Sequence, residues 1–331
     1  MKNVIKKLGL LALSSLLLSS CGAKEASKEK NVSGNIYKIG VVQIADHPSL
    51  DAAREGFIEA LDEDKDISYE LIDHRANGDI SLISQFGSDL KNKGANLIYT
   101  IGTPAAQGIA NTVSDIPVLF SAVTDPIGAG LVDEASKVGK NVSGVSDYVE
   151  AGKLIDDFLK LYPDTKVFGT MYNTNEQNSV VQIEALEKAI SERGLKLEKQ
   201  GVSSINDIPQ AIASLKTKID AMVTVTDNVV VNAMPVISEA LIKEKIPSIA
   251  YDEGSVENGA LISEGVNYRE LGKKAGKMAI KLLKEGKEIK DLPYENADVL
   301  KTLVNKKTAE TLGLDLNNDV LKDAEYVEGK E

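Results

Sequence analysis

The chain is poor in residues that many functional sites require. It holds one cysteine, two histidines and no tryptophan among 331 residues. A single thiol can form neither an internal disulfide nor a cysteine-based metal site. His47 and His74 lack the HExxH spacing of a zinc site, so we expect no bound metal and no other cofactor.

Motifs that carry common enzyme chemistries are also missing. The sequence contains no GxSxG, GxxxxGKS/T or CxxC motif, and Gly40-Val41-Val42 does not begin a GxGxxG dinucleotide fingerprint. The sequence therefore offers no set of residues that could carry out catalysis. We expect a protein that is not an enzyme.

Positive charge is scarce too. The formal net charge is −12, and arginine occurs only at Arg54, Arg75, Arg193 and Arg269. Nucleic-acid binding needs a basic face, and a bidentate phosphate clamp needs arginine. The composition therefore argues against nucleic acids as partners.

The N-terminal residues have the pattern of a bacterial export signal. Lys2, Lys6 and Lys7 precede an apolar run over residues 8–18, which is too short to remain as a membrane-spanning helix. Small residues follow, where a signal peptidase cleaves. We therefore predict a signal peptide over residues 1–20.

The end of that signal is similar to the lipobox of bacterial lipoproteins. The tetrad Leu18-Ser19-Ser20-Cys21 ends in the one cysteine of the chain, and in lipoproteins this cysteine is lipidated and becomes the new N-terminus. The polar residues that follow are typical of a flexible tether. We predict a lipid anchor on Cys21 and a tether over residues 21–35, with the folded part held at the outer face of a bacterial cell membrane.

The rest of the chain, from Ile36, is long enough for two lobes. Apolar runs of strand length alternate with segments of helical period, which is the pattern of βαβ units. The alternation predicts an α/β fold with two Rossmann-like lobes. The expected strands cover residues 37–44, 68–72, 97–101, 118–123, 166–172, 196–202, 221–225, 248–251, 260–266 and 299–304, and the expected helices cover residues 50–61 (capped by Ser49), 80–90, 104–113, 150–161, 178–193, 207–216, 230–243 and 268–283.

The tail after Gly259 holds more elements than the second lobe needs, so we expect the chain to cross back to the first lobe. Such crossings create hinges about which two lobes can close on a ligand. The predicted first lobe comprises residues 36–146 and about 255–290, the second comprises residues 147–254 and about 291–331, and the hinges lie near residues 144–147, 252–254 and 287–293.

One stretch of the first lobe predicts the wall of a ligand cleft. The apolar run at residues 97–101 is followed by a turn in which Pro104 suits a first helical position and Thr103 can cap the helix amides. The next strand, at residues 118–123, also ends in a polar turn. Open α/β sheets bind ligands at the carboxyl ends of their strands. The candidate contacts from these two turns are Thr103, Pro104, Ala105, Thr124 and Asp125.

Several motifs together resemble the substrate-binding lipoproteins of ABC transporters in the tryptophan/tyrosine-binding family. The resemblance covers residues 36 to about 324 and implies a type I periplasmic-binding-protein fold with three crossovers. It also implies an aromatic amino acid held between the lobes, with a membrane permease and an ATPase as partners; we expect a monomer. The motifs are the lipobox, KIGVVQIADHPSLDAAREGFIEAL from Lys38, IGTPAAQ from Ile101, PVLFSAVTDPIGAGLV from Pro117, NVSGVSD from Asn141, YNTNEQNS from Tyr172 and GVNYRELGKKAG from Gly265.

A zwitterionic ligand needs hydrogen-bond donors for its carboxylate. Because spare arginines are lacking, helix N-termini with hydroxyl or amide help are the natural donors. The turn that contains Asn175 and Glu176 opens a second-lobe helix, so Asn178 and Ser179 are the first choice, with Thr103 as an alternative or an addition. The same side chains could equally serve only as helix caps.

The ligand ammonium needs an acceptor. Asp227 and Asn228 come after a wholly apolar strand, and a buried carboxylate is stabilised when it meets a cation. Asp227 is therefore the predicted ammonium partner. Asp252 and Glu253 are the alternative pair, and each of these acids could instead cap a helix or form an ion pair at a hinge.

The loop before the first helix holds His47, which could stack on or hydrogen-bond the ligand ring, or could have no role in binding. Without tryptophan, ring packing has to come from tyrosine, phenylalanine, proline, leucine and peptide planes. The sequence does not distinguish tryptophan, tyrosine and phenylalanine as ligands, because a single hydroxyl partner decides among them.

Two other classes of function remain open. A surface-exposed lipoprotein of this fold could act as an adhesin or a sensor, with or without transport. The same fold could also receive a branched-chain amino acid, a sugar or a nucleoside. Sugar sites usually stack the ring on aromatic faces, so the absence of tryptophan weakens that version.

Overall fold

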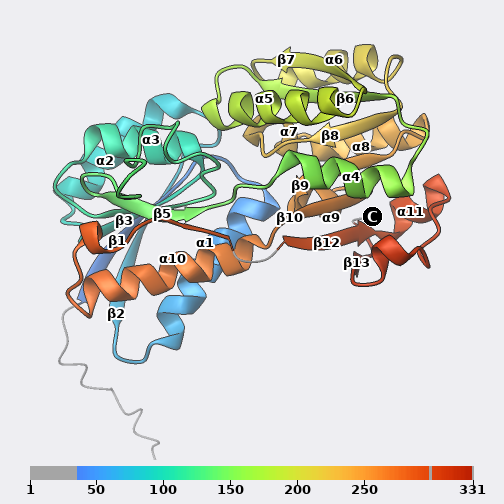
Figure 1. Ribbon diagram of the computed structural model, residues 1–331. Helices are drawn as coiled ribbons and strands as arrows, with labels where there is room; N and C mark the ends of the chain where they lie inside the picture. Colours follow the sequence, from blue (N-terminus) through green and yellow to red (C-terminus); the bar gives the residue numbers. More distant parts are fainter. Residues whose placement is uncertain (1–35, 298–299, 330–331) are drawn as a thin grey trace, which may run out of the picture. The chain divides into compact units, whose positions relative to one another are not determined.

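The computed structural model describes residues 36–297 and 300–329. The predicted signal peptide (residues 1–20), Cys21 and the tether (residues 21–35) lie outside the described residues. The described residues belong to one compact unit, Gly34–Glu331. This unit contains two α/β sheets with helices between their strands, which confirms the predicted fold class (Figure 1).

The first sheet has six parallel strands in the order β11-β5-β4-β3-β1-β2. Its central strands are buried along their whole length, as expected of a parallel sheet with helices on both faces. The strands are β1 (Ile36–Gln43), β2 (Ser68–Arg75), β3 (Leu97–Ile101), β4 (Val118–Ser121), β5 (Val142–Ser146) and β11 (Glu295–Asn296).

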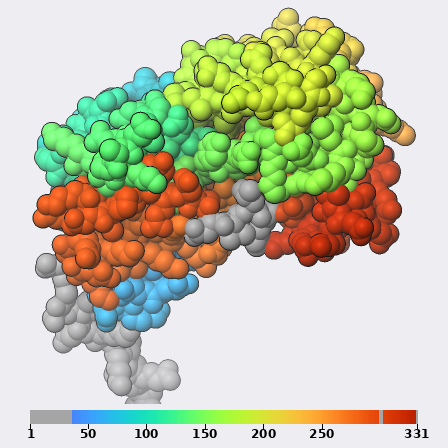
Figure 2. Space-filling view, in the orientation of Figure 1, coloured from blue at the N-terminus to red at the C-terminus, as the bar shows by residue number. Residues whose placement is uncertain are grey.

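Helices α1 (Pro48–Glu63) and α10 (Tyr268–Leu283) pack together on the first sheet although they lie far apart in the sequence. Their contact depends on glycine, because a Cβ added to Gly56 would lie 1.9 Å from the backbone oxygen of Arg269. Figure 2 shows the orange residues around α10 beside the blue residues of α1. The other face of the sheet carries α2 (Ile83–Asn92) and α3 (Thr103–Thr112) (Figure 1).

The second sheet has seven strands in the order β13-β12-β10-β9-β8-β6-β7, and β10 and β12 run antiparallel. The strands are β6 (Val167–Asn173), β7 (Lys196–Val202), β8 (Ala221–Thr224), β9 (Ser248–Asp252), β10 (Ile262–Val266), β12 (Leu300–Asn305) and β13 (Glu325–Val327). The helices of this lobe are α4 (Ala151–Leu161), α5 (Gln177–Glu192), α6 (Ile208–Leu215), α7 (Asn228–Asn232), α8 (Met234–Lys243), α9 (Glu253–Glu257) and α11 (Lys306–Leu312).

The chain crosses between the sheets three times: between β5 and α4, between β10 and α10, and between β11 and β12. These crossings differ in place from the predicted lobe boundaries near residues 255 and 291, because β10 pairs with β9 in the second sheet and β11 pairs with β5 in the first. The predicted hinge at residues 252–254 instead connects β9 to α9 within the second lobe.

Three helices begin earlier than the sequence predicts. Ser49, Thr103 and Asn178, each expected at or just before a helix start, lie in the first turns of α1, α3 and α5. Ser49 bonds to Asp252 and to the amide of Gly254, and Asn178 bonds to the backbone oxygen of Thr226. The hydroxyl of Thr103 has no partner among the described residues. The predicted helix over residues 230–243 is divided into α7 and α8.

Candidate ligand-binding site

A cavity lies where the carboxyl ends of strands from both sheets meet. Its walls come from residues at or after the ends of β3, β4 and β5 in the first sheet and β8 and β9 in the second, together with helix starts. This is the position at which open α/β sheets bind ligands. The first lobe contributes His47, Leu50, Thr103, Ala122, Thr124 and Tyr268, and the second contributes Asn178, Thr226, Asn228, Val231 and Asp252. Asp147 lies on the crossing between β5 and α4.

Three buried polar atoms that belong to the lining residues have no hydrogen-bond partner among the described residues. They are Thr103 Oγ1, His47 Nδ1 and Asn178 Oδ1. An unsatisfied buried polar atom costs roughly 1–3 kcal/mol, so native proteins rarely keep several together. The cavity therefore has unused hydrogen-bonding capacity of the kind that a polar small molecule would satisfy.

The N-terminus of α3 reaches this cavity through Thr103. Gly102 precedes the helix with a φ of 97°, a conformation that favours glycine, and accepts the amide of Ala106 at 3.1 Å. The earlier amides of a helix have no acceptor within it, and Pro104 has no amide hydrogen to satisfy. With the hydroxyl of Thr103, this helix end can hold an anionic group such as a carboxylate.

Ala122 lines the cavity with a φ of 55°. An alanine in this left-handed region costs about 1–2 kcal/mol, and such strain clusters at ligand sites. The sharp turn at Ala122 ends β4 and directs the following residues, among them Thr124, into the cavity.

Asp147 follows β5 and is 2% exposed. Its Oδ1 accepts a hydrogen bond from Thr124 Oγ1 at 3.0 Å, and its Oδ2 accepts one from the Tyr268 hydroxyl at 2.7 Å. Burial raises the pKa of the Asp147 carboxyl above its ordinary value, and the nearby charge of Asp252 raises it further. Both donors are neutral, so a cation placed here would stabilise the ionised carboxylate.

Asp252 ends β9 and is 1% exposed. Its Oδ1 accepts from the Ser49 hydroxyl at 2.6 Å, and its Oδ2 accepts from the Ser255 hydroxyl at 2.6 Å. Ser49 belongs to the first lobe, so this contact joins the two lobes. Asp147 and Asp252 together place two carboxyl groups, held by neutral donors, in the wall of one cavity.

Asp227, the predicted ammonium partner, caps α7 and is fully buried outside the cavity lining. Its Oδ1 accepts from the amides of Val229 and Val230 at 3.0 and 2.9 Å. Its Oδ2 accepts from the Ser179 hydroxyl at 2.7 Å and from the amide of Asn173. Four protein donors satisfy this carboxylate, so its geometry favours a structural role.

The donors of the turn at Asn175 and Glu176 are also taken by the protein. The amide of Asn175, which is exposed, donates to Asn173 Oδ1 at 3.0 Å. The side-chain nitrogen of Asn178 donates to the backbone oxygen of Thr226 at 2.9 Å. Its remaining atom in the cavity, Oδ1, is an acceptor. Asn178 is therefore better suited to a ligand ammonium than to the predicted carboxylate.

His47 lies between the lobes and is 7% exposed. Its Nε2 is 3.5 Å from Asn228 Oδ1. Burial lowers the pKa of His47 below its ordinary value, so the ring is neutral at pH 7. A neutral imidazole keeps one acceptor nitrogen, and here that nitrogen can face the ligand.

The remaining predicted residues occupy different places. Ala105 is buried in the first turn of α3, and Asp125 closes a turn by accepting the amide of Gly128 at 2.9 Å. Pro104 and Glu176 line a second cavity of about 270 Å³. This second cavity adjoins the first, because Asn228 lines both.

Six lining residues are absent from the sequence prediction: Leu50, Ala122, Asp147, Thr226, Val231 and Tyr268. Asp147 directly follows a strand, as the predicted contacts do, but β5 contains Gly144 and two serines and does not have the apolar pattern of a buried strand. Tyr268 stands at the start of α10, which the sequence prediction places in the first lobe, but no local pattern shows that the first residue of this helix reaches the cavity.

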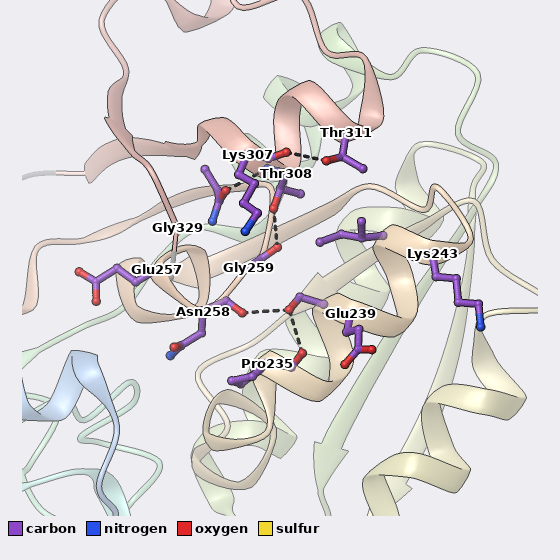
Figure 3. Close-up of a pocket in the computed structure, with 13 residues that line it drawn as sticks. Pro235, Glu239, Lys243, Glu257, Asn258, Gly259, Lys307, Thr308, Thr311 and Gly329 are labelled. Atoms are coloured by element: carbon purple, nitrogen blue, oxygen red, sulfur yellow. Dashed lines mark hydrogen bonds between the residues drawn. The ribbon is translucent and has the colours of Figure 1, made fainter. Parts of the chain in front are cut away.

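Another hollow, of about 730 Å³, lies in the second lobe between α8, α9 and α11 (Figure 3). Two of its buried hydroxyls are engaged within the protein: Thr308 Oγ1 donates to the backbone oxygen of Gly259 at 3.1 Å, and Ser238 Oγ donates to that of Asn258 at 2.9 Å. Among the described residues, no buried side-chain atom without a partner belongs to its lining. This hollow lacks the unused hydrogen-bonding capacity of the cavity between the lobes.

Within residues 36–297 and 300–329, no group of three or more histidine, cysteine or acidic side chains is placed to hold a metal ion. No helix of this part of the chain has the length and apolar character needed to cross a membrane.

Comparison with known families identifies the class of protein. The family model described as ABC transporter substrate binding protein matches residues 38–328. The chain belongs to this family. The sequence resemblance is thereby confirmed, and members of this family serve as substrate-binding components of transporters rather than as enzymes.

Individual relatives agree with the family. The chain is 39% identical to a tyrosine-binding protein of Clostridioides difficile (strain R20291), over 92% of this chain and 90% of the relative. A Streptococcus pneumonia ABC domain crystallised in complex with L-Trp has a TM-score of 0.82 at 33% identity, covering 88% of this chain and 100% of that one.

Two further solved structures extend the comparison. A ligand-free, open structure of a Clostridium difficile substrate-binding protein with adhesive properties has a TM-score of 0.68 at 38% identity, covering 89% of this chain and 100% of that one. A leucine-binding protein of Thermotoga maritima, with a TM-score of 0.60 at 13% identity over 84% of this chain and 87% of that one, shares the fold. These likenesses confirm the predicted type I periplasmic-binding-protein architecture of two lobes.

Proposed function

We propose that this protein is the receptor of an ABC importer and binds an aromatic L-amino acid in the cavity between its lobes. The observation that carries the proposal is the polarity of that cavity. Thr103, at the start of α3, lines the same cavity as the buried carboxyl groups of Asp147 and Asp252. A zwitterion matches this arrangement, because its carboxylate needs donors and its ammonium needs acceptors.

The aromatic nature of the ligand is supported by relatives of this chain. One relative is named a tyrosine-binding protein, and another was crystallised with L-Trp. Leu50, Val231 and the ring of Tyr268 also line the cavity and offer apolar surface to a ring. The cavity measures only about 20 Å³ as the lobes stand, so the lobes have to separate for an amino acid to enter.

We assign the ligand carboxylate and ammonium to positions in the cavity from its unpaired polar atoms and its buried carboxyl groups. The carboxylate lies at the start of α3, against the Thr103 hydroxyl and the first helix amides. The ammonium lies against Asp147, Asp252 and Asn178 Oδ1. Asp227, the choice from sequence, remains the alternative ammonium partner, although its carboxylate is already satisfied by four donors.

The location and partners follow from the sequence signals together with the family. We infer that Cys21 is lipidated and that the tether holds the lobes at the outer face of the cell membrane. A permease and an ATPase receive the ligand, and the receptor acts as a monomer. The first lobe comprises residues 36–146 with α10 and β11, and the second comprises the remaining described elements.

Adhesion is a second candidate function. The Clostridium difficile relative described as having adhesive properties is 38% identical to this chain. An adhesive role would use the outer surface and need not compete with ligand binding. Attachment of protein-coated beads to host cells, measured with the cavity empty and saturated with ligand, tests this candidate separately.

A thermal-shift screen against the standard amino acids, several sugars and several nucleosides tests the main proposal. A ligand that binds only the folded state raises the melting temperature in proportion to its occupancy. We expect a clear rise with one or more aromatic L-amino acids. No rise with any of them would leave the family and fold standing and would overturn the assignment of the ligand.

A further inference from the structure

Glu176 lies at the N-terminal end of α5, where four amide groups donate to its carboxylate. Both the backbone and the side-chain nitrogen of Asn228 donate to Oε2, the backbone at 3.3 Å. The side-chain amides of Asn178 and Asn173 donate at 3.4 and 3.2 Å. Two of these donors, Asn178 and Asn228, line the ligand cavity, whereas Glu176 itself does not.

The charge of Glu176 fixes how the side-chain amide of Asn228 is turned. An ionised carboxylate can only accept hydrogen bonds, so the NH₂ group of Asn228 must point toward it. The NH₂ group of Asn178 points toward Glu176 and also toward the backbone oxygen of Thr226, which is closer at 2.9 Å. The carbonyl oxygens of both side chains then point elsewhere. Asn178 Oδ1 is buried without a partner, and Asn228 Oδ1 lies 3.5 Å from His47 Nε2.

His47 continues the same chain of contacts into the first lobe. Because Asn228 presents an oxygen, a neutral His47 meets it with Nε2–H, and this contact fixes the tautomer of the ring. Nδ1 is then an acceptor, and it is buried without a partner. His47 of the first lobe and Asn228 of the second both line the cavity, so the side-chain orientations that Glu176 sets affect the ligand site from both lobes.

We propose that Glu176 is a positioning residue that sets the polarity of the cavity. By accepting from Asn228 it fixes the tautomer of His47 and leaves His47 Nδ1 as an acceptor atom in the cavity, beside Asn178 Oδ1. These acceptors select a ligand that carries an ammonium group. The inference rests on the amino-acid function proposed above. It adds that Glu176 determines which end of the zwitterion binds at this side of the cavity. Glu176 acts through its neighbours and does not touch the ligand.

Protonation of Glu176 reverses the direction of one hydrogen bond in this series of contacts. Burial, and then the charge of Asp227, raise the pKa of Glu176 to about 7. Asp227 at the start of α7 is the charged group that faces it, and His47 faces it through Asn228. Once protonated, Glu176 donates a hydrogen bond, and one amide must turn its oxygen away from the cavity side. We therefore expect ligand affinity to fall as the pH drops through about 7.

Isothermal titration calorimetry on wild type, Glu176→Gln and Glu184→Gln tests the proposal. Glu184 is an exposed glutamate on α5, so its variant makes the same charge change on the same helix. The ligands are the amino acid with the largest thermal shift and its analogue that lacks the amino group. Glu176→Gln should lower affinity for the amino acid about tenfold at pH 8, leave the analogue within twofold, and remove the decline near pH 7. Glu184→Gln should match wild type.

Each other outcome has a definite meaning. Unchanged affinities and pH profile in Glu176→Gln would overturn the proposal, and so would an equal loss for both ligands, which indicates a purely structural role. If no amino acid binds to wild type, the proposed function itself fails and this inference fails with it. If the variant does not fold, the tautomer of His47 in wild type, read from ¹⁵N NMR at pH 8, decides: Nε2–H supports the proposal and Nδ1–H contradicts it.

Discussion

The hydroxyl of Tyr268 donates a 2.7 Å hydrogen bond to Asp147 Oδ2, and the two residues stand beside different crossings between the sheets. Asp147 follows β5, and Tyr268 begins α10 just after β10. Because both residues line the cavity, a ligand there touches the segments about which two lobes of this fold move. We therefore expect ligand contacts at this pair to bias the lobe arrangement directly.

The first prediction concerns the charge of Asp147. Asp147→Asn keeps the size of the side chain and removes the negative charge that we assign to the ligand ammonium. Affinity for the amino acid should fall by about 2 kcal/mol or more, which is roughly 30-fold. Titration calorimetry measures the change, and Asp125→Asn, outside the cavity, serves as the matched control. A change below threefold would move the ammonium site to Asp252.

The second prediction separates Asp227 from Asp147. Asp227→Ala removes the cap of α7 and leaves four buried donors without an acceptor. The free energy of unfolding should therefore fall by about 2 kcal/mol or more. The loss of ligand affinity should be smaller than in Asp147→Asn. Urea denaturation and titration of the same sample give both numbers. A stable variant with a 30-fold loss of affinity would restore Asp227 as the ammonium partner.

Most of the fold follows from local patterns in the sequence. The apolar runs that became β3 and β4, and the helical periods that became α1 and α10, are visible because burial alternates with the period of each element. The lobe to which β10 and β11 belong cannot be read from such local patterns. Their places in the sheets depend on strand pairing: β10 pairs with the preceding strand, β9, and β11 pairs with β5, which lies much earlier in the chain.

The site shows the same division between local and distant information. Thr103 and His47 can be predicted, because turns after strands and before helices place polar groups at a sheet edge. The role of Asp227 cannot be read in this way. A carboxylate after an apolar strand gives the same sequence pattern whether it binds a cation or caps the next helix. The hydrogen-bond donors that distinguish the two roles, such as Ser179, come from another element of the chain.

The third prediction concerns the donor at the start of α3. Thr103→Val keeps the shape of the side chain and removes a hydroxyl that has no partner among the described residues. The unliganded protein should be as stable as wild type or slightly more stable, since an unsatisfied buried group is lost. Affinity should fall about tenfold, because a hydrogen bond to the ligand carboxylate disappears. Unchanged affinity would place the carboxylate elsewhere in the cavity.

The last prediction concerns stability without ligand. The pKa of Glu176 is raised from 4.5 to about 7 in the folded protein, first by burial and then by Asp227. The folded state therefore holds the proton more tightly than the unfolded state, so this contribution to stability is complete below pH 4.5 and is lost as the pH rises through about 7. Glu176→Gln carries no titrating group and escapes that loss. The difference in free energy of unfolding between variant and wild type should shift in favour of the variant between pH 4.5 and pH 8.

Urea denaturation of the ligand-free proteins at pH 4.5, 6 and 8 measures this difference, with the exposed Glu184→Gln as the control for charge alone. A difference that stays constant with pH would mean that Glu176 titrates normally in the fold and would remove the basis for its effect on the cavity. Glu176→Gln could gain stability relative to wild type as the pH rises and yet bind the amino acid more weakly at pH 8. That result would indicate that the buried charge is retained for ligand recognition rather than for folding.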